Sequence, residues 1–208
     1  MTVNTILNSF LNDVTPSMHK VRRTSLNAMV TSLMSGAPCS VTGLGKNSDS
    51  NTSEKHQIKR SMRLCSHRYL QGEIGSIYSL MTHRLIGQQQ RPVILVDWSD
   101  VEPGKQHFLF RASLAVEDRS LTVLEQIYPV TQKEKPAVHT LFMTKLKSLL
   151  PPRCKPIIVS NPGFRVPWFR LIESLGWHYV GRVRNRTFCQ SDKDYEKIQQ
   201  LIQEPLNV

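Results

Sequence analysis

The chain has 208 residues, of which 39% are hydrophobic and 21% charged, enough for one medium domain or two small ones with a buried core. No run approaches the roughly 20 apolar residues of a membrane-spanning helix. Residues 1–13 lack the basic start and apolar run of a secretory signal. The four cysteines are scattered without a CxxC pair, so neither a disulfide framework nor a zinc site is indicated. Membrane and secreted classes are disfavoured, and we expect a cytoplasmic protein.

The formal net charge of +11, from 27 basic and 16 acidic side chains, favours a polyanionic partner. Nucleic acid is the simplest such partner, because each neutralised phosphate releases counterions. The alternative is a basic surface that has no partner. The positive charge is spread along the sequence rather than gathered in a basic tail, so any binding surface must be assembled by folding.

Residues 1–35 are predicted to be helical, because apolar residues recur at spacings of three to five. The residues expected on the buried faces are Val14, Met18, Val21, Leu26, Met29, Val30, Leu33 and Met34. Thr15-Pro16 matches an N-cap followed by proline at the first helical position, and it predicts a helix start there. Residues 35–38 end the pattern, and residues 40–51 are predicted to form a short helix or turn and a loop.

A second block, residues 55–64, combines basic and apolar positions on one predicted helix. Lys55, Lys59 and Arg63 recur every four residues and form one basic stripe, flanked by His56 and Arg60. The residues expected to face away from the stripe are Ile58, Met62 and Cys65. A helix with one cationic face suits docking on a DNA duplex, although a solvated helix face gives the same pattern. With a further amphipathic helix over residues 70–86 and a linker over 87–90, residues 1–88 are predicted to form a helical DNA-binding unit.

From Arg91 onward the pattern changes to strands, beginning with a continuous apolar run at residues 92–99. The other predicted strands are residues 107–116, 121–130, 156–160 and 177–183, and the predicted helices are residues 137–149 and 166–175. Short turns join the first three strands into an antiparallel meander, and crossovers make the last two parallel to the first. The predicted fold class is α+β/α/β, with a ribonuclease H-like β-β-β-α-β-α-β core over residues 89–190.

Two polar residues end neighbouring strands of this predicted sheet: Asp97 in the first and Asn161 directly after the fourth. Carboxylates at such an edge are hard oxygen ligands for Mg²⁺, and two metal ions about 4 Å apart can clamp the attacking and leaving oxygens of a phosphodiester. Asp97 is therefore the candidate catalytic residue and metal ligand. The alternative is a strand-end aspartate satisfied by backbone or by a nearby arginine.

Several segments carry a more specific pattern. They are residues 94–100 (Ile-Leu-Val-Asp-Trp-Ser-Asp), residues 157–168 (Ile-Ile-Val-Ser-Asn-Pro-Gly-Phe-Arg-Val-Pro-Trp), Leu175-Gly176-Trp177 and Arg182-Val183-Arg184. Together they resemble an insertion-sequence DDE transposase of the cut-and-paste branch found in bacterial composite resistance transposons. Residues 55–64 resemble the region of that branch that binds transposon ends. The resemblance implies a bacterial, nucleoid-associated protein that binds double-stranded DNA at transposon ends and uses Mg²⁺ to cleave and transfer DNA strands.

The resemblance implies a site of two Asp and one Glu, and this chain departs from it. Asp97 matches the first Asp, but Asn161 stands at the position of the second catalytic Asp. The Glu-bearing helix, which follows a β-rich insertion in the family, has no match; residues 191–208 correspond to the start of that insertion or to a tail. The resemblance thus implies a truncated, catalytically incomplete core. One sheet face would lack its closing helix, which favours a homodimer or marginal stability.

Arg182 and Arg184 would follow DNA phosphates near the site according to the resemblance, with solvated edge charge as the alternative. Two functional hypotheses remain. The first is a transposase-family protein that binds transposon ends but is catalytically incomplete. The second is a non-catalytic DNA-binding module that occupies transposon ends and antagonises an intact transposase.

Overall fold

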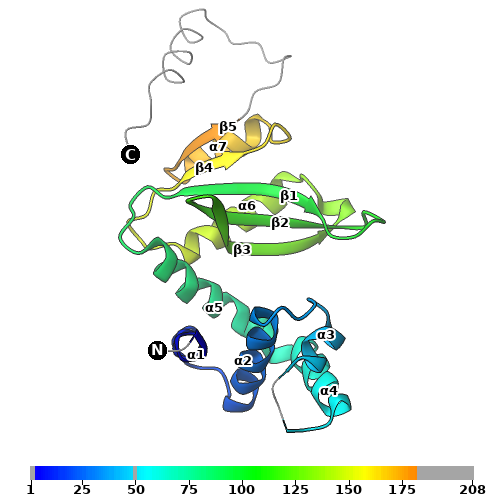
Figure 1. Cartoon of the computed structure of the whole chain (residues 1–208). Helices are drawn as coiled ribbons and strands as arrows, with labels where there is room; N and C mark the ends of the chain where they lie inside the picture. The colour runs from blue at the N-terminus through cyan, green and yellow to red at the C-terminus, as the bar shows by residue number, and fades with distance from the viewer. Residues whose placement is uncertain (1–2, 49–50, 182–208) are drawn as a thin grey trace, which may run out of the picture.

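The computed structural model describes residues 3–48 and 51–181 (Figure 1). In chain order the elements are α1 (Val3–Val14), α2 (Lys20–Met34), α3 (Val41–Lys46), α4 (Glu54–Cys65), α5 (Arg68–Ile86), β1 (Val93–Asp100), β2 (His107–Val116), β3 (Arg119–Pro129), a 3-10 turn (Val130–Gln132), α6 (Pro136–Leu149), β4 (Ile157–Ser160), α7 (Val166–Ser174) and β5 (His178–Gly181). The predicted order β-β-β-α-β-α-β is confirmed. The division predicted at residue 88 falls between α5 and β1.

The five strands form one mixed sheet in the order β3-β2-β1-β4-β5. β1 pairs antiparallel with β2, which pairs antiparallel with β3. On its other side β1 pairs parallel with β4, which pairs parallel with β5. The protein therefore has a mixed α and β architecture in which β1 is the central strand, as its apolar run predicts.

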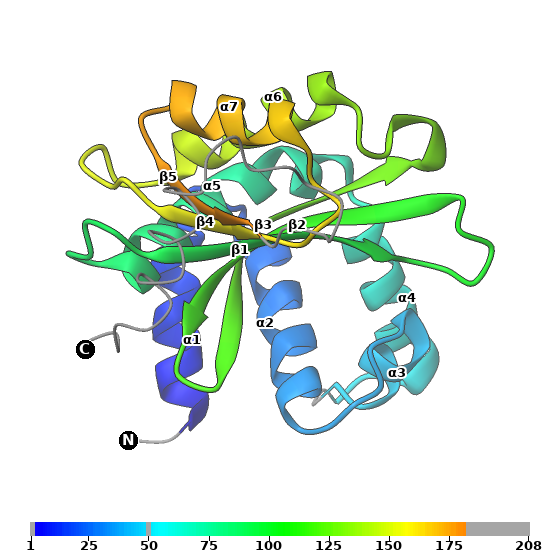
Figure 2. The same cartoon turned by 90° about the horizontal axis from the view of Figure 1, so that it is seen from above.

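One face of the sheet holds the hydrophobic core. Ile94, Phe110 and Ile158 from three neighbouring strands pack with Phe142 of α6 and Trp168 of α7, and all are almost fully buried. Figure 2 shows α6 and α7 on this side of the sheet and α1 and α2 on the other. Leu95 and Asp97 lie on the second face of the sheet, and both residues are exposed. We call this second face the open face.

Helix α5 joins the helical unit to the sheet. Near its beginning Glu73 forms an ion pair with Arg22 of α2. Near its end Ile86 enters the core of the sheet, and Thr82 Oγ1 donates a hydrogen bond to the carbonyl oxygen of Val123 at 3.4 Å. One continuous helix thus contacts both parts of the molecule. Among the described residues, no helix is both long enough and apolar enough to cross a membrane.

The predicted helix start at Thr15-Pro16 is wrong. The Thr15 hydroxyl donates to the carbonyl oxygen of Leu11 at 2.7 Å, so Thr15 closes the end of α1 instead. Helix α2 begins at Lys20, and its N-cap is His19, whose Nδ1 accepts a hydrogen bond from the backbone N–H of Val21 at 3.3 Å. A side chain that bonds back to the preceding turn is unavailable for capping the next helix.

The apolar faces predicted for α2 and α4 are only partly buried. In α2 the buried residues are Ser25, Met29 and Ser32, whereas Val21, Leu33 and Met34 are exposed. In α4 the buried residues are Gln57, Ser61 and Leu64, whereas Met62 and Cys65 are exposed. Small polar residues occupy the contacts between these helices, because the backbones approach closely. An ideal Cβ on Gly45 of α3 would lie 2.5 Å from Ile58 Cα of α4.

Candidate functional site

Asp97 and Asn161 lie side by side, as the strand order predicts. Val96 of β1 is in register with Ser160 of β4, so Asp97 and Asn161 follow where the pairing of β1 with β4 stops. The prediction that Asp97 ends its strand is wrong, because β1 continues to Asp100 in its pairing with β2. The Asn161 side-chain Nδ2 donates a hydrogen bond to Asp97 Oδ1, which also accepts the backbone N–H of Trp98 at 2.7 Å. Asn161 Oδ1 accepts the backbone N–H of Gly163 at 2.9 Å. Both side chains belong to exposed residues, and they form a closed hydrogen-bonded pair.

This donor set does not fit a Mg²⁺ site. Mg²⁺ requires oxygen ligands in near-octahedral geometry, usually with carboxylate charge. Here Asp97 supplies one carboxylate, and Asn161 directs its N–H protons toward it rather than an oxygen toward a shared cation. Among the described residues no group of three His, Cys, Asp or Glu side chains could hold a metal ion.

A row of charged residues crosses the open face beside Asp97. Arg111 of β2 is the register partner of Asp97, and Glu125 of β3 is the register partner of Arg111. Arg111 Nε donates to Glu125 Oε2 at 3.1 Å. Tyr78 of α5 reaches the same carboxylate. Burial, together with the charge of Glu125 and a hydrogen bond to it, raises the pKa of Tyr78 to about 12. Sequence analysis missed these three residues, because only a known register reveals them.

A recess lies next to the Asp97 edge, between the start of α6 and the turn before α7. Its volume is about 330 Å³, and its wall includes His139, Phe164 and Trp168. Burial lowers the pKa of His139, and the charge of Glu134 partly opposes this. Among the described residues His139 Nε2 has no hydrogen-bond partner. Trp168 and Trp177 are buried, and Trp98 stacks on Phe110 with ring centroids 4.2 Å apart, so the three tryptophans belong to the core or pack against it.

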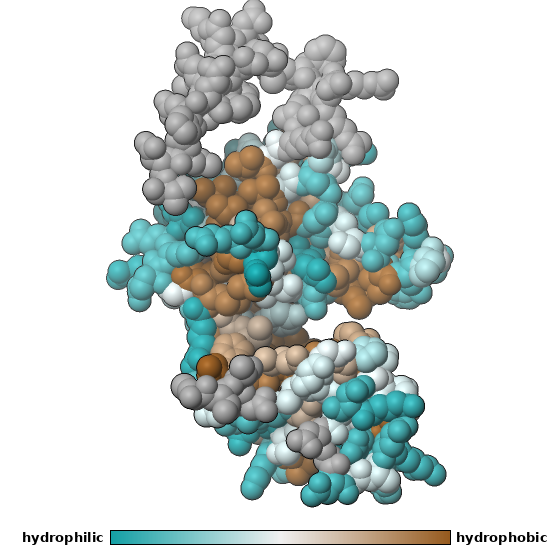
Figure 3. All heavy atoms as spheres, viewed as in Figure 1, coloured by the Kyte–Doolittle hydropathy of each residue, from teal (hydrophilic) through white to brown (hydrophobic). Residues whose placement is uncertain are grey.

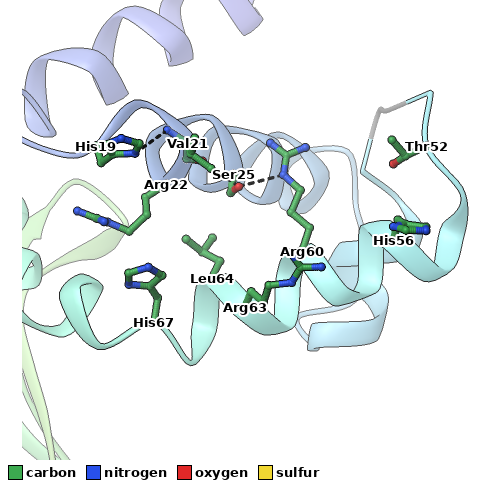
Figure 4. Close-up of a pocket in the computed structure, with 10 residues that line it drawn as sticks. All are labelled: His19, Val21, Arg22, Ser25, Thr52, His56, Arg60, Arg63, Leu64 and His67. Carbon is green, nitrogen blue, oxygen red and sulfur yellow. Dashed lines mark hydrogen bonds between the residues drawn. The ribbon is translucent and has the colours of Figure 1, made fainter.

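The helical unit contains a basic groove between α2 and α4 (Figure 4). Its volume is about 550 Å³, and the residues lining it are His19, Val21, Arg22, Ser25, Thr52, His56, Arg60, Arg63, Leu64 and His67. Three of these are arginines and three are histidines, and none of the described lining residues is acidic. The charge of Arg22 is partly compensated by its ion pair with Glu73, and the hydrogen bond to that carboxylate raises the pKa of the guanidinium. A groove of this composition attracts anions.

The predicted DNA-binding residues of α4 divide into two groups. His56, Arg60 and Arg63 line the groove, whereas Lys55 and Lys59 are exposed outside it. Their roles stay predictions.

Arg60 also has a structural function in the helical unit. Its Nε donates to Ser25 Oγ at 3.0 Å and its Nη2 donates to the Thr24 carbonyl oxygen at 2.9 Å, so Arg60 fastens α4 to α2. Arg182 and Arg184 lie outside the described residues.

Sequence analysis did not assign His19, Arg22 and His67 to the groove. His67 is the N-cap of α5, and its Nδ1 accepts the backbone N–H of Tyr69 at 3.3 Å, as His19 does for α2. Both histidines therefore lie at helix N-termini that open onto one groove. In the sequence, only the position of a histidine directly before each helix indicated this arrangement, and that indication is weak.

Comparison with protein-family models, with curated proteins and with solved structures returned no match to this chain. No known protein therefore assigns a role to either site, and their possible functions follow from their geometry. This geometry provides a basic groove on the helical unit and, at the sheet edge, a hydrogen-bonded Asp97–Asn161 pair beside the charged row of Arg111 and Glu125.

Proposed function

We propose that this chain is a DNA-binding protein of the transposase family, which binds double-stranded DNA at transposon ends through its helical unit. The observation that carries the proposal is the groove between α2 and α4, lined by three arginines and three histidines. Phosphate groups are the ligands that such a surface attracts, and phosphate contacts account for most of the affinity of DNA-binding proteins. The groove uses the same segment, residues 55–64, that resembles the end-binding region of the family.

The sheet supports the finer part of the proposal, a ribonuclease H-like core. Its strand order and directions agree with that topology, and Asp97 lies next to Asn161 where the pairing of the central strand with β4 stops. In the intact family this edge would hold Mg²⁺ for strand cleavage and transfer. Asn161 removes one negative charge and donates to Asp97, so we infer that this chain does not cleave DNA by itself.

The same observation favours a second candidate function. A protein that keeps the end-binding surface but cannot cleave would occupy transposon ends and antagonise an intact transposase. The two candidate functions differ in the effect that this chain would have on an intact transposase. Under the antagonist function, an excess of this chain lowers cleavage of an end-containing duplex by an intact transposase of the same branch. Either function places the protein in the bacterial cytoplasm with the nucleoid.

The test measures the affinity for a labelled mixed-sequence DNA duplex by fluorescence anisotropy over a range of salt concentrations. Each lost phosphate contact lowers the slope of log K against log salt by about 0.9. Arg63→Gln in the groove and Lys59→Gln on the stripe each remove one positive charge from α4. Arg153→Gln is the matched control, since Arg153 is exposed after α6, away from the helical unit.

We expect Arg63→Gln and Lys59→Gln to reduce the slope and Arg153→Gln to leave it unchanged. Arg60 is left out of this set, because its loss would also loosen α2 from α4. A variant combining Lys55→Gln, Lys59→Gln and Arg63→Gln that binds as tightly as the parent chain, with the same slope, would exclude DNA binding by this surface.

A further inference from the structure

The row that crosses the open face beside Asp97 contains one exposed cation, Arg111. Asp97 and Arg111 are direct partners in the antiparallel pair of β1 and β2. Side chains at such positions point to the same face, with Cβ atoms about 5 Å apart. The Arg111 side chain is 44% exposed. Its charge is therefore presented to the surroundings at the edge where the proposed function expects DNA.

Two further residues fix the direction of the Arg111 guanidinium. Glu125 Oε2 accepts from Arg111 Nε at 3.1 Å, and Tyr78 of α5 lies with Glu125 in the wall of one recess, where interaction with this carboxylate contributes to the raised pKa of Tyr78. Among the described residues the hydrogen bond of Arg111 is made through Nε, and no partner is seen for the two terminal nitrogens. These nitrogens form the fork that matches two oxygens of a phosphate.

We propose that Arg111 binds a phosphate of the DNA backbone at the Asp97 edge, and that Glu125 and Tyr78 are positioning residues that hold its guanidinium for this contact. The proposal rests on the proposed DNA binding. Figures 1 and 2 place α1 and α2 beyond β3 and on the same side of the sheet as the open face, so a duplex bound by the helical unit has access to this row. Tyr78 lies on α5, the helix that connects the two parts.

A purely structural role for the row makes the opposite prediction. If Arg111 only neutralises Glu125, then Glu125→Gln removes a negative charge near the DNA, and the affinity for a polyanion stays equal or rises. If Glu125 positions Arg111 for a phosphate, Glu125→Gln weakens binding even though the protein becomes more positive. The direction in which Glu125→Gln changes the affinity for DNA therefore distinguishes the phosphate-binding role of Arg111 from a purely structural one.

The experiment uses the full chain and the same mixed-sequence duplex, with affinity measured against salt concentration. We expect Arg111→Gln to bind roughly threefold to tenfold more weakly and to reduce the salt slope by about one. Arg111→Lys should keep the slope and recover part of the affinity, because it retains the charge without the fork. Glu125→Gln and Tyr78→Phe should weaken binding with the slope retained. Arg119→Gln, an exposed arginine at the other end of β3, is the matched control and should bind as the parent does.

Thermal melting followed by circular dichroism accompanies each variant, so that only folded proteins are compared. Arg111→Gln that behaves like Arg119→Gln, or Glu125→Gln that binds as tightly as the parent or tighter, overturns this inference. If Arg63→Gln still weakens binding in that case, the proposed function survives and only the role of Arg111 is lost. A parent chain that does not bind the duplex at all overturns both.

Discussion

The amide of Asn161, directly after β4, donates a hydrogen bond to the carboxylate of Asp97 in β1. Two carboxylates at these positions would repel each other and would be stabilised by a cation between them. An amide and a carboxylate satisfy each other without a cation. The residue at position 161 therefore decides whether this edge of the sheet is a metal site or a self-contained hydrogen-bonded pair.

Asn161→Asp should convert the hydrogen-bonded pair into two carboxylates that attract a cation. Without divalent cations we expect the variant to lose about 1 kcal/mol of stability, because a hydrogen bond is replaced by like-charge repulsion. Mg²⁺ or Mn²⁺ should raise the melting temperature of the variant and leave that of the parent unchanged, as measured by calorimetry. Under the proposed function we expect no nicking of duplex DNA by the variant, since the resemblance to transposases implies a third acidic ligand that has no match in this sequence.

The matched control for this change is the double variant Asp97→Asn with Asn161→Asp. It exchanges the two groups and keeps a single charge, so it should melt like the parent and show no response to either metal. A metal-dependent rise in the melting temperature of the parent chain would contradict the account of Asn161.

Two glycines should respond to alanine with opposite signs. Gly45 lies against the backbone of α4, where a Cβ would be 2.5 Å from Ile58 Cα, so Gly45→Ala should force α3 and α4 apart and cost about 2 kcal/mol or more. Gly75 is inside α5, and a Cβ there would have nothing within 4 Å. Gly75→Ala should therefore stabilise the protein by about 0.5–1 kcal/mol through helix propensity. The midpoints of urea unfolding measure both effects, and a stabilised Gly45→Ala variant would refute the close approach.

The same close approach explains why sequence patterns failed in the helical unit but succeeded in the sheet. Strands β1, β2 and β4 are apolar runs between turn residues, and their order follows from connection rules, which also bring Asp97 to Asn161. In contrast, α2, α3 and α4 pack through small residues such as Ser32 and Ser61, both buried. There the size of a side chain matters more than its hydrophobicity, so the apolar periodicity selected the wrong faces.

The candidate site was predictable to a similar extent. The closeness of Asp97 and Asn161 could be predicted from the sequence, because β1 and β4 are parallel neighbours, but the sequence did not show that β1 continues to Asp100. The pairing of Arg111 with Asp97 depends on the register of β2, which the turn between the strands sets. The groove needed the packing of α4 against α2, since His19 and Arg22 are distant from Arg63 in sequence.

His139 should make the stability of the protein depend on pH. Burial lowers the pKa of this histidine below its ordinary value of 6.5. As pH falls below that value, the unfolded chain takes up a proton that the folded protein does not, so the free energy of unfolding decreases. The decrease should continue until the pH reaches the lowered pKa. Well above pH 6.5 the imidazole is neutral in both states and contributes no pH dependence.

His139→Phe removes this titration and keeps an aromatic ring among Phe110, Phe164 and Trp168. Urea unfolding of the parent and the variant should be compared from neutral pH to about pH 5, the range in which histidine changes charge. We expect the parent to lose more stability over this range than the variant does. Equal losses in both proteins would show that His139 does not titrate differently on folding.

The open face of the sheet should drive self-association. Leu95, Val159 and Val180 are register neighbours across β1, β4 and β5, so they form one apolar row on this face. Leu95 is 38% exposed and Val180 is 56% exposed. Figure 3 shows hydrophobic side chains gathered on this side of the sheet. Exposed apolar surface on a sheet favours pairing with a second copy, and among the described residues β5 is also an edge strand of the sheet.

Sedimentation velocity of the parent chain should therefore show a dimer or larger species whose fraction rises with protein concentration. Val180→Lys places a charge on the row and beside the open edge, and it should shift the population toward monomer. The matched control is Val166→Lys, because Val166 is 59% exposed in the first turn of α7, on the covered side of the sheet. This substitution adds the same charge to the protein, so net repulsion between copies is equal in the two variants. A parent that remains monomeric at all concentrations, or equal dissociation by both variants, would exclude the open face as the surface of association.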